Sequence, residues 1–223
     1  MKIKDKCQKI QEKLNHHFPD PAIPLDHRNP YTFLIAVMLS ASANDKKVNQ
    51  VTPKLFDLAE TPEQMIALSV QQIQKIIHDV GLSGSKAKNV HAMSQLLIEK
   101  HDSTVPSTFE ELEALPGVGH KTASVIMSQV HNIPAFAVDT HIHRLAYRWG
   151  LSDGRNVVQT EKDLKKHFPP ESWNKLHLQI IYFGRAFCPA LRHNIEECPI
   201  CAWAGIKTRL AEEKTRSAPW QNK

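Results

Sequence analysis

The sequence has no long hydrophobic run and few cysteines. Its longest uninterrupted apolar segment covers 33–39 and ends at Ser40, which is too short to cross a bilayer. Residues 1–7 are basic but no apolar stretch follows them, so we expect no secretory signal, no membrane partner and a cytoplasmic protein. Four cysteines in 223 residues are too few for a disulfide scaffold. Three of them crowd into 188–201, which in a reducing compartment indicates a metal site before a disulfide.

Convincing alternation of apolar and polar residues, the pattern of a half-buried strand, is also missing. Apolar residues instead recur at helical spacing in segments such as 70–80 and 87–97, and Gly81 is expected to end the first. Short joints carrying glycine, proline or serine separate these segments, which predicts an all-α protein. The polar tail 212–223 is expected to fray.

The overall composition is that of an ordinary globular chain, with 41% hydrophobic and 23% charged residues. Its length suits one large or two modest domains. The 28 lysines and arginines exceed the 23 aspartates and glutamates, which gives a net charge of +5. A positive chain is attracted to polyanions, so nucleic acid is a candidate partner whose binding should weaken with salt.

Segment 115–123 reads Leu-Pro-Gly-Val-Gly-His-Lys-Thr-Ala and lies between two predicted helices. Gly117 and Gly119 let the backbone turn sharply and approach another molecule, while Val118 can anchor the turn in the core. The following helix offers unpaired N–H groups and the positive end of its dipole, which together form an anion site. These features indicate a hairpin that holds a DNA phosphate without reading sequence. An ordinary helix–helix joint is the alternative interpretation.

Lys121 falls just inside that second helix, where the dipole and nearby basic groups disfavour a protonated amine. A lysine is nucleophilic only when an appreciable fraction of it is neutral, so this setting favours a nucleophilic role. Taken in isolation, Lys121 would be a solvated lysine or a simple phosphate contact.

Asp139 follows an apolar segment and stands at the start of another predicted helix. Aspartate is a common N-cap, and backbone N–H groups there would keep its carboxylate ionised and oriented. Capping and catalysis can coexist, because a fixed carboxylate beside an amine suits proton transfer and stabilises a developing cation.

The helix predicted after Asp139 carries two histidines and two arginines. We interpret His141 and His143 as structural residues or phosphate contacts rather than acid–base groups. Arg144 and Arg148 lie one turn apart and are most simply a solvated face.

The hairpin segment, with its lysine eighteen residues before the aspartate of Val-Asp-Thr-His, resembles endonuclease III. That family comprises bifunctional DNA glycosylases and abasic-site lyases of the helix-hairpin-helix superfamily. The likeness extends over roughly residues 5–205, which makes it far more specific than any single motif. Further stretches that agree in order and spacing are 34–40, 48–49, 81–87 and 178–185.

The resemblance implies a two-lobed helix-hairpin-helix DNA glycosylase fold with the DNA cleft between its lobes. A six-helix domain over 23–132 would carry the hairpin, and 1–22 with 133–223 would form a second helical domain. The partner would be damaged double-stranded DNA, bound by a monomer associated with the nucleoid. The expected DNA contacts are Gly117, Val118, Gly119, His120, Thr122, Leu82, Ser42 and His141.

The implied activity is base excision repair of DNA damage by one enzyme, a glycosidase (a hydrolase) that is also a lyase and endonuclease at abasic sites. Lys121 would attack the sugar C1′ of a flipped, oxidised pyrimidine nucleotide, expel the base and leave a Schiff base. β-Elimination would then cut the strand 3′ to the abasic site. Asp139 would activate the lysine and support the sugar cation, and no cofactor would be required for this chemistry.

Two further positions relate to the flipped nucleotide. Leu82 matches the family's wedge that opens the base stack, although a loop leucine folded into the core is the alternative. Ser42 stands where the family has a glutamine that fills the gap left by the flipped base. A serine is too short for that task, so lesion choice and affinity are expected to depart from the family's.

The cysteine spacing departs from the family as well. Members that carry a [4Fe–4S] cluster have four cysteines spaced C-x6-C-x2-C-x5-C near the carboxyl end. Here Cys188 and Cys198 have nine intervening residues, Cys198 and Cys201 keep two, and Lys207 takes the fourth position. Because a cubane cluster normally needs four thiolates, the motif is incomplete.

Two other residues could complete a metal site. Cys7 is remote in sequence and could contribute only if the fold brought it near the other three cysteines. His193 would give a set of three cysteines and one histidine, which is acceptable for zinc. We rank a loop without metal first, a degenerate iron–sulfur cluster second and zinc third.

Alternatives to this enzyme come from other classes. A non-catalytic helix-hairpin-helix module would use the same hairpin only to bind phosphate, and would not need Asp139. The adenine-excising relative acts without a lysine nucleophile, which Lys121 argues against. A metal-dependent nuclease would need an oxygen-rich site, and the sequence offers no tight cluster of carboxylates.

Overall fold

The computed structural model describes residues 1–215 and 218–219. Within these residues the chain forms helices and loops but no strand, so the predicted all-α class is confirmed. Its contacts divide it into two compact units: unit 1 comprises Met1–Ala22 with Pro134–Lys223, and unit 2 comprises Ile23–Ile133. No described helix combines the length and the apolar character needed to span a membrane.

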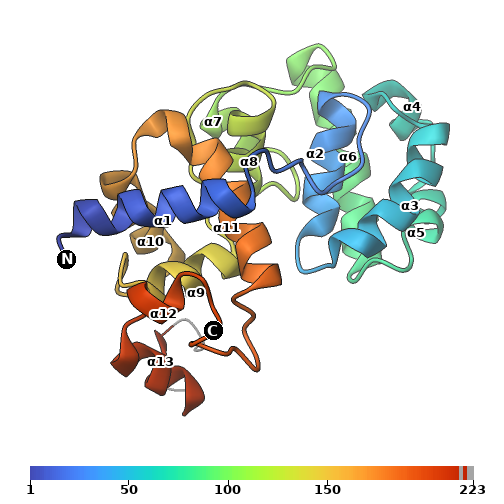
Figure 1. Cartoon of the computed structure of the whole chain (residues 1–223). Coiled ribbons are helices and arrows are strands. Elements are labelled where there is room, and N and C mark those ends of the chain that lie inside the picture. Colours follow the sequence, from blue (N-terminus) through green and yellow to red (C-terminus); the bar gives the residue numbers. More distant parts are fainter. Residues whose placement is uncertain (216–217, 220–223) are drawn as a thin grey trace. The chain divides into compact units, whose positions relative to one another are not determined.

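Unit 2 is organised around α2 (Pro30–Ser40), which packs against α3, α6 and α8. Residues 31–39 of α2 are all buried, because this segment is apolar on every side and neighbouring helices enclose it. Asn29 begins the helix by accepting a hydrogen bond from the Thr32 backbone N–H. The other helices of the unit, which Figure 1 labels, are α3 (Asp45–Leu58), α4 (Pro62–Ile66), α5 (Val70–Ile76), α6 (Ser83–His101), α7 (Phe109–Glu113) and α8 (His120–Gln129).

The apolar pattern over 70–80 is only partly helical. Helix α5 ends at Ile76, before the Gly81 that was expected to end it. Ile77 and Val80 are buried all the same, because a turn closed by the Val80 N–H and the Ile77 carbonyl at 2.9 Å turns both side chains inward. The turn therefore buries Ile77 and Val80 at the same sequence spacing as a helix would, although the helix has already ended. The segment 87–97 lies within α6, as predicted.

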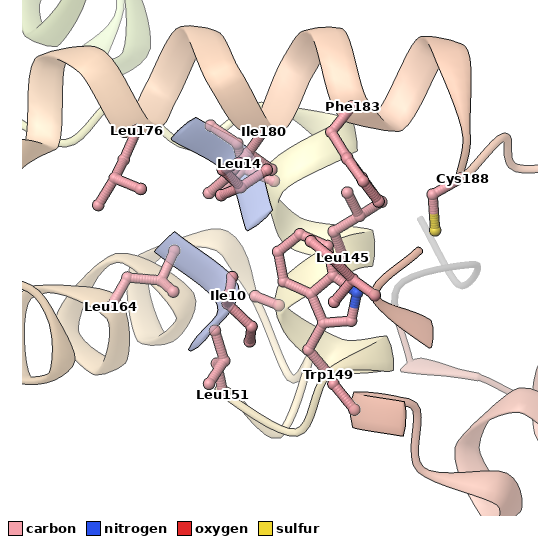
Figure 2. Close-up of a cluster of buried hydrophobic side chains, with 14 of the residues drawn as sticks. Ile10, Leu14, Leu145, Trp149, Leu151, Leu164, Leu176, Ile180, Phe183 and Cys188 are labelled. Carbon is pink, nitrogen blue, oxygen red and sulfur yellow. The ribbon is translucent and has the colours of Figure 1, made fainter. Parts of the chain in front are cut away.

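Unit 1 combines the amino-terminal helix with the carboxyl-terminal third of the chain. In it α11 packs against α1 and α9, and Figure 2 shows the apolar side chains, Trp149 and Phe183 among them, that fill the space between these helices. Segments far apart in sequence thus share one core. The helices of the unit are α1 (Ile3–His17), α9 (Thr140–Arg148), α10 (Val157–His167), the 3-10 helix η1 (Pro170–Ser172), α11 (Trp173–Ala186), α12 (Cys201–Ala204) and α13 (Lys207–Lys214).

Two expectations about unit 1 are wrong. Arg144 and Arg148 are buried rather than solvated, at 3% and 1% exposure, because α10, α11 and α13 all pack against α9. Of the tail 212–223 that was expected to fray, residues 212–214 are instead helical, and Glu213 on α13 forms an ion pair with Arg148 at 2.7 Å. Of the remaining tail, 216–217 and 220–223 lie outside the described residues.

Candidate functional site

The predicted hairpin of unit 2 joins α7 to α8. Its turn is closed by a hydrogen bond from the Val118 N–H to the Leu115 carbonyl at 3.1 Å, and Val118 is 7% exposed, so it anchors the turn in the core. Gly117 has φ of +82°, a left-handed conformation that favours glycine. Gly119 is the N-cap of α8, and no described side chain caps that helix end. The turn thus presents backbone N–H groups at a helix amino terminus, an arrangement that can bind an anion.

The two glycines of the turn serve different purposes. A Cβ on Gly117 would lie 2.8 Å from Asn89 Nδ2 and 2.9 Å from Met38 Sδ, so these side chains would have to shift, and the positive φ adds backbone strain. A Cβ on Gly119 would meet nothing within 4 Å. Gly119 therefore faces open space, where the backbone can be approached closely by another molecule.

This difference predicts opposite effects for two matched substitutions. Gly117→Ala should lower the free energy of unfolding by about 1–3 kcal/mol, because the methyl group meets both strain and steric overlap. Gly119→Ala should change it by less than about 1 kcal/mol, yet weaken binding to a duplex with an abasic-site analogue. Denaturant unfolding and fluorescence anisotropy measure the two quantities. Undiminished DNA affinity in Gly119→Ala would contradict contact at this turn.

The side chains that follow the turn point to different surroundings. Lys121 is the second residue of α8 and is exposed, so its amine stands at the positive end of the helix dipole. His120 is exposed too, and its Nδ1 lies 2.7 Å from Glu113 Oε1 while its ring stacks on Phe109. Thr122, the third residue of α8, is buried, at 8% exposure.

Asp139, in unit 1, is the N-cap of α9, as the sequence indicated. Its Oδ1 accepts a hydrogen bond from the Ile142 N–H at 2.8 Å, and the side chain is half-buried. The cap fixes the orientation of the carboxylate and uses only one of its two oxygens. Oδ2 takes no part in the cap, so a structural and a chemical role are compatible in one residue.

The two histidines of α9 have distinct environments. His143 is buried and its Nδ1 lies 2.8 Å from Thr160 Oγ1, and burial lowers the pKa of its ring. His141 is half-buried, and its Nδ1 accepts from the Arg144 guanidinium at 3.2 Å. Because an arginine only donates, the neutral His141 ring carries its proton on Nε2. His143 is thus a buried structural residue, and His141 is tied to Arg144 on the same helix.

Leu82 and Ser42 both occupy strained turns of unit 2. Each has a left-handed backbone, with φ of 61° and 55°, and each is exposed; Leu82 has 72% of its surface free. A leucine folded into the core is therefore not what the structure contains. An apolar side chain held outward by a strained backbone is typical of a functional contact.

Lys86 is a positioning residue that the sequence did not single out. It is buried in α6, and its Nζ donates to the backbone carbonyls of Leu39 at 2.9 Å and Ala41 at 2.7 Å. Burial lowers the pKa of its amine. These bonds join the start of α6, next to Leu82, to the end of α2, next to Ser42. The burial of Lys86 could have been predicted from its spacing, because it lies on the same helical face as the apolar residues Val90 and Met93.

The three clustered cysteines of unit 1 come together with His193. Their ligand atoms, three sulfurs and one ring nitrogen, all lie within 4.8 Å of one another. Cys7 is buried in the same apolar core but does not belong to this group, and Lys207 is exposed at the start of α13. We call this group the cysteine–histidine cluster, and its members are Cys188, His193, Cys198 and Cys201.

Hydrogen bonds within the cluster shift the pKa values of its thiols. The Cys188 and Cys201 thiols donate to Cys198, which lowers the pKa of Cys198 far below its usual range and raises that of Cys201. The pKa of Cys188 is raised to about 11. Arg148 also contacts this cluster, although the sequence predicted a solvated side chain. Its Nη1 donates to the Cys188 sulfur at 3.0 Å and to the Pro189 carbonyl at 2.9 Å.

Known proteins resemble this chain over both of its units. The family model of the HhH-GPD superfamily of base excision DNA repair proteins matches residues 35–170. Endonuclease III of Escherichia coli (strain K12) is 40% identical over 197 residues, covering 88% of this chain and 93% of that protein. Endonuclease III of Bacillus subtilis (strain 168) is 39% identical, covering 85% and 87%, and that of Treponema pallidum (strain Nichols) is 44% identical, covering 85% and 90%.

Solved structures give the same result. A non-covalent endonuclease III–DNA complex and a trapped endonuclease III–DNA covalent intermediate each match with a TM-score of 0.88 and 37% identity. Both alignments cover 97% of this chain and 99% of the other. A thermostable thymine-DNA glycosylase, at 20% identity and a TM-score of 0.75, shares the fold.

Proposed function

The chain belongs to the endonuclease III family within the HhH-GPD superfamily of base excision DNA repair proteins, and from this premise we propose how it acts. It is a bifunctional enzyme that excises oxidised pyrimidines from damaged double-stranded DNA and cleaves the resulting abasic site. The observation that carries the proposal is the likeness to a protein trapped in covalent linkage with DNA. Such a linkage requires a nucleophile, and Lys121 offers an exposed amine at an open helix amino terminus.

Lys121 supplies the electron pair in the proposed reaction. Its neutral amine attacks C1′ of the flipped nucleotide, the C1′–N bond breaks, and the base leaves with that bonding pair and takes up a proton. The sugar ring opens to an imine between Nζ and C1′. Loss of a proton from C2′ then breaks the C3′–O bond, which cuts the strand, and water finally hydrolyses the imine to free the lysine.

Asp139 acts as a general base and as an electrostatic stabiliser in the same reaction. Its carboxylate accepts the proton that Lys121 must shed and stabilises the positive charge that develops on the sugar as the base departs. The hairpin contributes through Gly117, Val118 and Gly119, which hold a DNA phosphate by its oxygens so that binding does not depend on sequence. Every step uses an amine, a carboxylate and water, so the chemistry requires no metal ion.

Borohydride trapping tests this function against simple DNA binding. The purified chain is incubated with a duplex that contains one thymine glycol, in EDTA, with and without borohydride. We expect strand incision without the reductant and a covalent protein–DNA adduct with it. A non-catalytic module would bind the duplex and give neither product. A panel of oxidised pyrimidines then measures lesion preference, which Ser42 is expected to influence.

Leu82 is proposed to enter the base stack when the damaged nucleotide is flipped. Leu82→Ala should leave the free energy of unfolding within about 0.5 kcal/mol, because the side chain is 72% exposed. It should slow excision of a base-paired lesion about tenfold or more, since unstacking costs a few kcal/mol. The rate at which Leu82→Ala cleaves a preformed abasic site should fall less than its rate of base excision. Single-turnover rates on both duplexes measure this, with exposed Leu58→Ala as the matched control.

The surroundings of the enzyme follow from its substrate. Lys121 and Asp139 both belong to one chain, so a monomer suffices for the reaction. We place the protein in the cytoplasm with the nucleoid, where damaged DNA is found. We propose that two domains contribute different functional residues. The domain over 23–132 carries the hairpin and Lys121, and the domain formed by 1–22 and 133–223 carries Asp139.

A further inference from the structure

We infer that the cysteine–histidine cluster binds a single zinc ion, in place of the [4Fe–4S] cluster that the family resemblance implies. The inference is independent of the reaction proposed for Lys121. It rests on the spacing of the ligand atoms, on the identity of the donors and on the local backbone that holds them.

The spacing of the ligand atoms is that of a site for one ion. The sulfurs of Cys188 and Cys201 are 3.6 Å apart, and all four ligand atoms of the cluster lie within 4.8 Å of one another. Tetrahedral zinc with Zn–S bonds near 2.3 Å requires sulfurs about 3.8 Å apart. A cubane has four irons and four sulfides between its thiolates, so it must separate them much further. The cluster is too compact to enclose one.

The identity of the donors agrees with this spacing. A cubane normally takes four thiolates, and the residue at the fourth family position is Lys207, exposed on α13. The fourth donor here is an imidazole, and three cysteines with one histidine are an established structural zinc set. Within the described part of the chain, His193 Nε2 is buried and has no hydrogen-bond partner. The His193 side chain also forms a hydrogen bond with the Cys198 thiol, so the ring lies in direct contact with the sulfur ligands.

The backbone around the cluster is shaped to hold these ligands. Cys188 follows directly on α11, and Figure 2 shows it just beyond the end of that helix, at the edge of the apolar core. Arg192 has a left-handed φ of 57°, which turns the loop immediately before His193. Cys198 and Cys201 form a tight turn in which the Cys201 N–H donates to the Cys198 sulfur at 3.4 Å.

The surroundings indicate a structural ion rather than a catalytic one. The three cysteines are buried, and four protein ligands would fill the coordination of a zinc ion, so no position would remain for a substrate. Arg148 donates a hydrogen bond to the Cys188 sulfur and is itself held by Glu213 on α13, which gives the site an outer layer of partners. The ion would join the end of α11, the loop 189–197 and α12.

Metal analysis of the purified full-length chain is the primary test. We expect about one zinc per chain, with iron and acid-labile sulfide below about a tenth of an equivalent. Four irons with four sulfides per chain would overturn the inference, and so would a protein that retains neither metal after expression in zinc-replete medium. Replacement of the zinc by Co²⁺ should give the visible spectrum of a tetrahedral thiolate site. An octahedral cobalt spectrum would also contradict the proposal.

Three variants separate metal binding from folding. His193→Ala should lose at least about nine-tenths of the zinc, whereas His193→Cys should retain it in a site with four thiolates. Cys7→Ala is the matched control, because Cys7 is a buried cysteine outside the cluster, and it should keep a full equivalent. Removal of zinc by a chelator should lower the melting temperature by at least about 5 °C, reversibly on adding zinc. Full zinc content in His193→Ala would refute the assignment of that ligand.

Discussion

Lys121→Gln should abolish the borohydride-trapped adduct and slow strand incision by at least about 10³-fold, because no imine can form without the amine. Glutamine has a similar length and helix propensity, and the side chain is exposed, so the free energy of unfolding should change by less than about 0.5 kcal/mol. Affinity for an undamaged duplex should fall less than about tenfold, since one positive charge is lost. Gel electrophoresis after trapping, single-turnover incision assays, denaturant unfolding and anisotropy measure the four quantities.

Lys54→Gln is the matched control for that experiment. Lys54 is exposed on α3 of the same unit, and its substitution removes the same charge. Adduct yield in this variant should equal that of the unmodified chain. If Lys121→Gln kept its adduct, or if Lys54→Gln lost it as completely, Lys121 would not be the nucleophile.

Asp139→Asn should slow incision by about 10²–10⁴-fold, the usual contribution of a positioned acid–base group. Asparagine is as good an N-cap as aspartate, so the hydrogen bond from the Ile142 N–H should be retained and the melting temperature should change little. Binding to a duplex with a reduced abasic site should be unaffected or slightly tighter, because a negative charge is removed. Incision kinetics, thermal unfolding and anisotropy together separate the chemistry from the cap.

Asp139→Ala provides the complementary variant. It should lose the same activity and in addition about 1 kcal/mol of stability, because alanine cannot cap α9. An Asp139→Asn enzyme that retained a tenth or more of the incision rate would show that the carboxylate only caps the helix. The comparison therefore decides between the two interpretations of this residue.

The parts of the molecule that the sequence predicted are those governed by local rules. The hairpin was recognisable because Gly117 needs a left-handed backbone and Val118 needs a buried position, and both needs appear as residue types at fixed spacing. The cap at Asp139 was recognisable for the same reason. Helical periodicity gave the all-α class, and it failed over 77–80, where a turn reproduces the spacing of a helix.

The parts that could not be predicted depend on contacts between distant segments. Arg148 was taken for a solvated residue because its partners, Cys188 and Glu213, are 40 and 65 positions away. Lys86 is buried only because the end of α2 presents two backbone carbonyls to it. Long-range partners of this kind leave no periodic signal in the chain.

The cysteine–histidine cluster lies between these cases. The spacing of its cysteines was visible in the sequence, and His193 could be named as a fourth ligand, but only the fold shows that their ligand atoms lie within 4.8 Å. That distance is too short for a [4Fe–4S] cubane, and metal analysis decides between the proposed zinc ion and a loop without metal. Cys7 packs in the same apolar core as the three cysteines, but it is not part of the group whose ligand atoms lie within 4.8 Å of one another.

Peptide mapping of the reduced adduct tests the central claim most directly. The chain is trapped with borohydride on a damaged duplex, digested with nuclease and protease, and analysed by tandem mass spectrometry. We predict that the deoxyribose remnant is attached to Nζ of Lys121, in the peptide that contains the hairpin turn. Attachment to another lysine or to the amino-terminal amine, with Lys121 unmodified, would contradict the account.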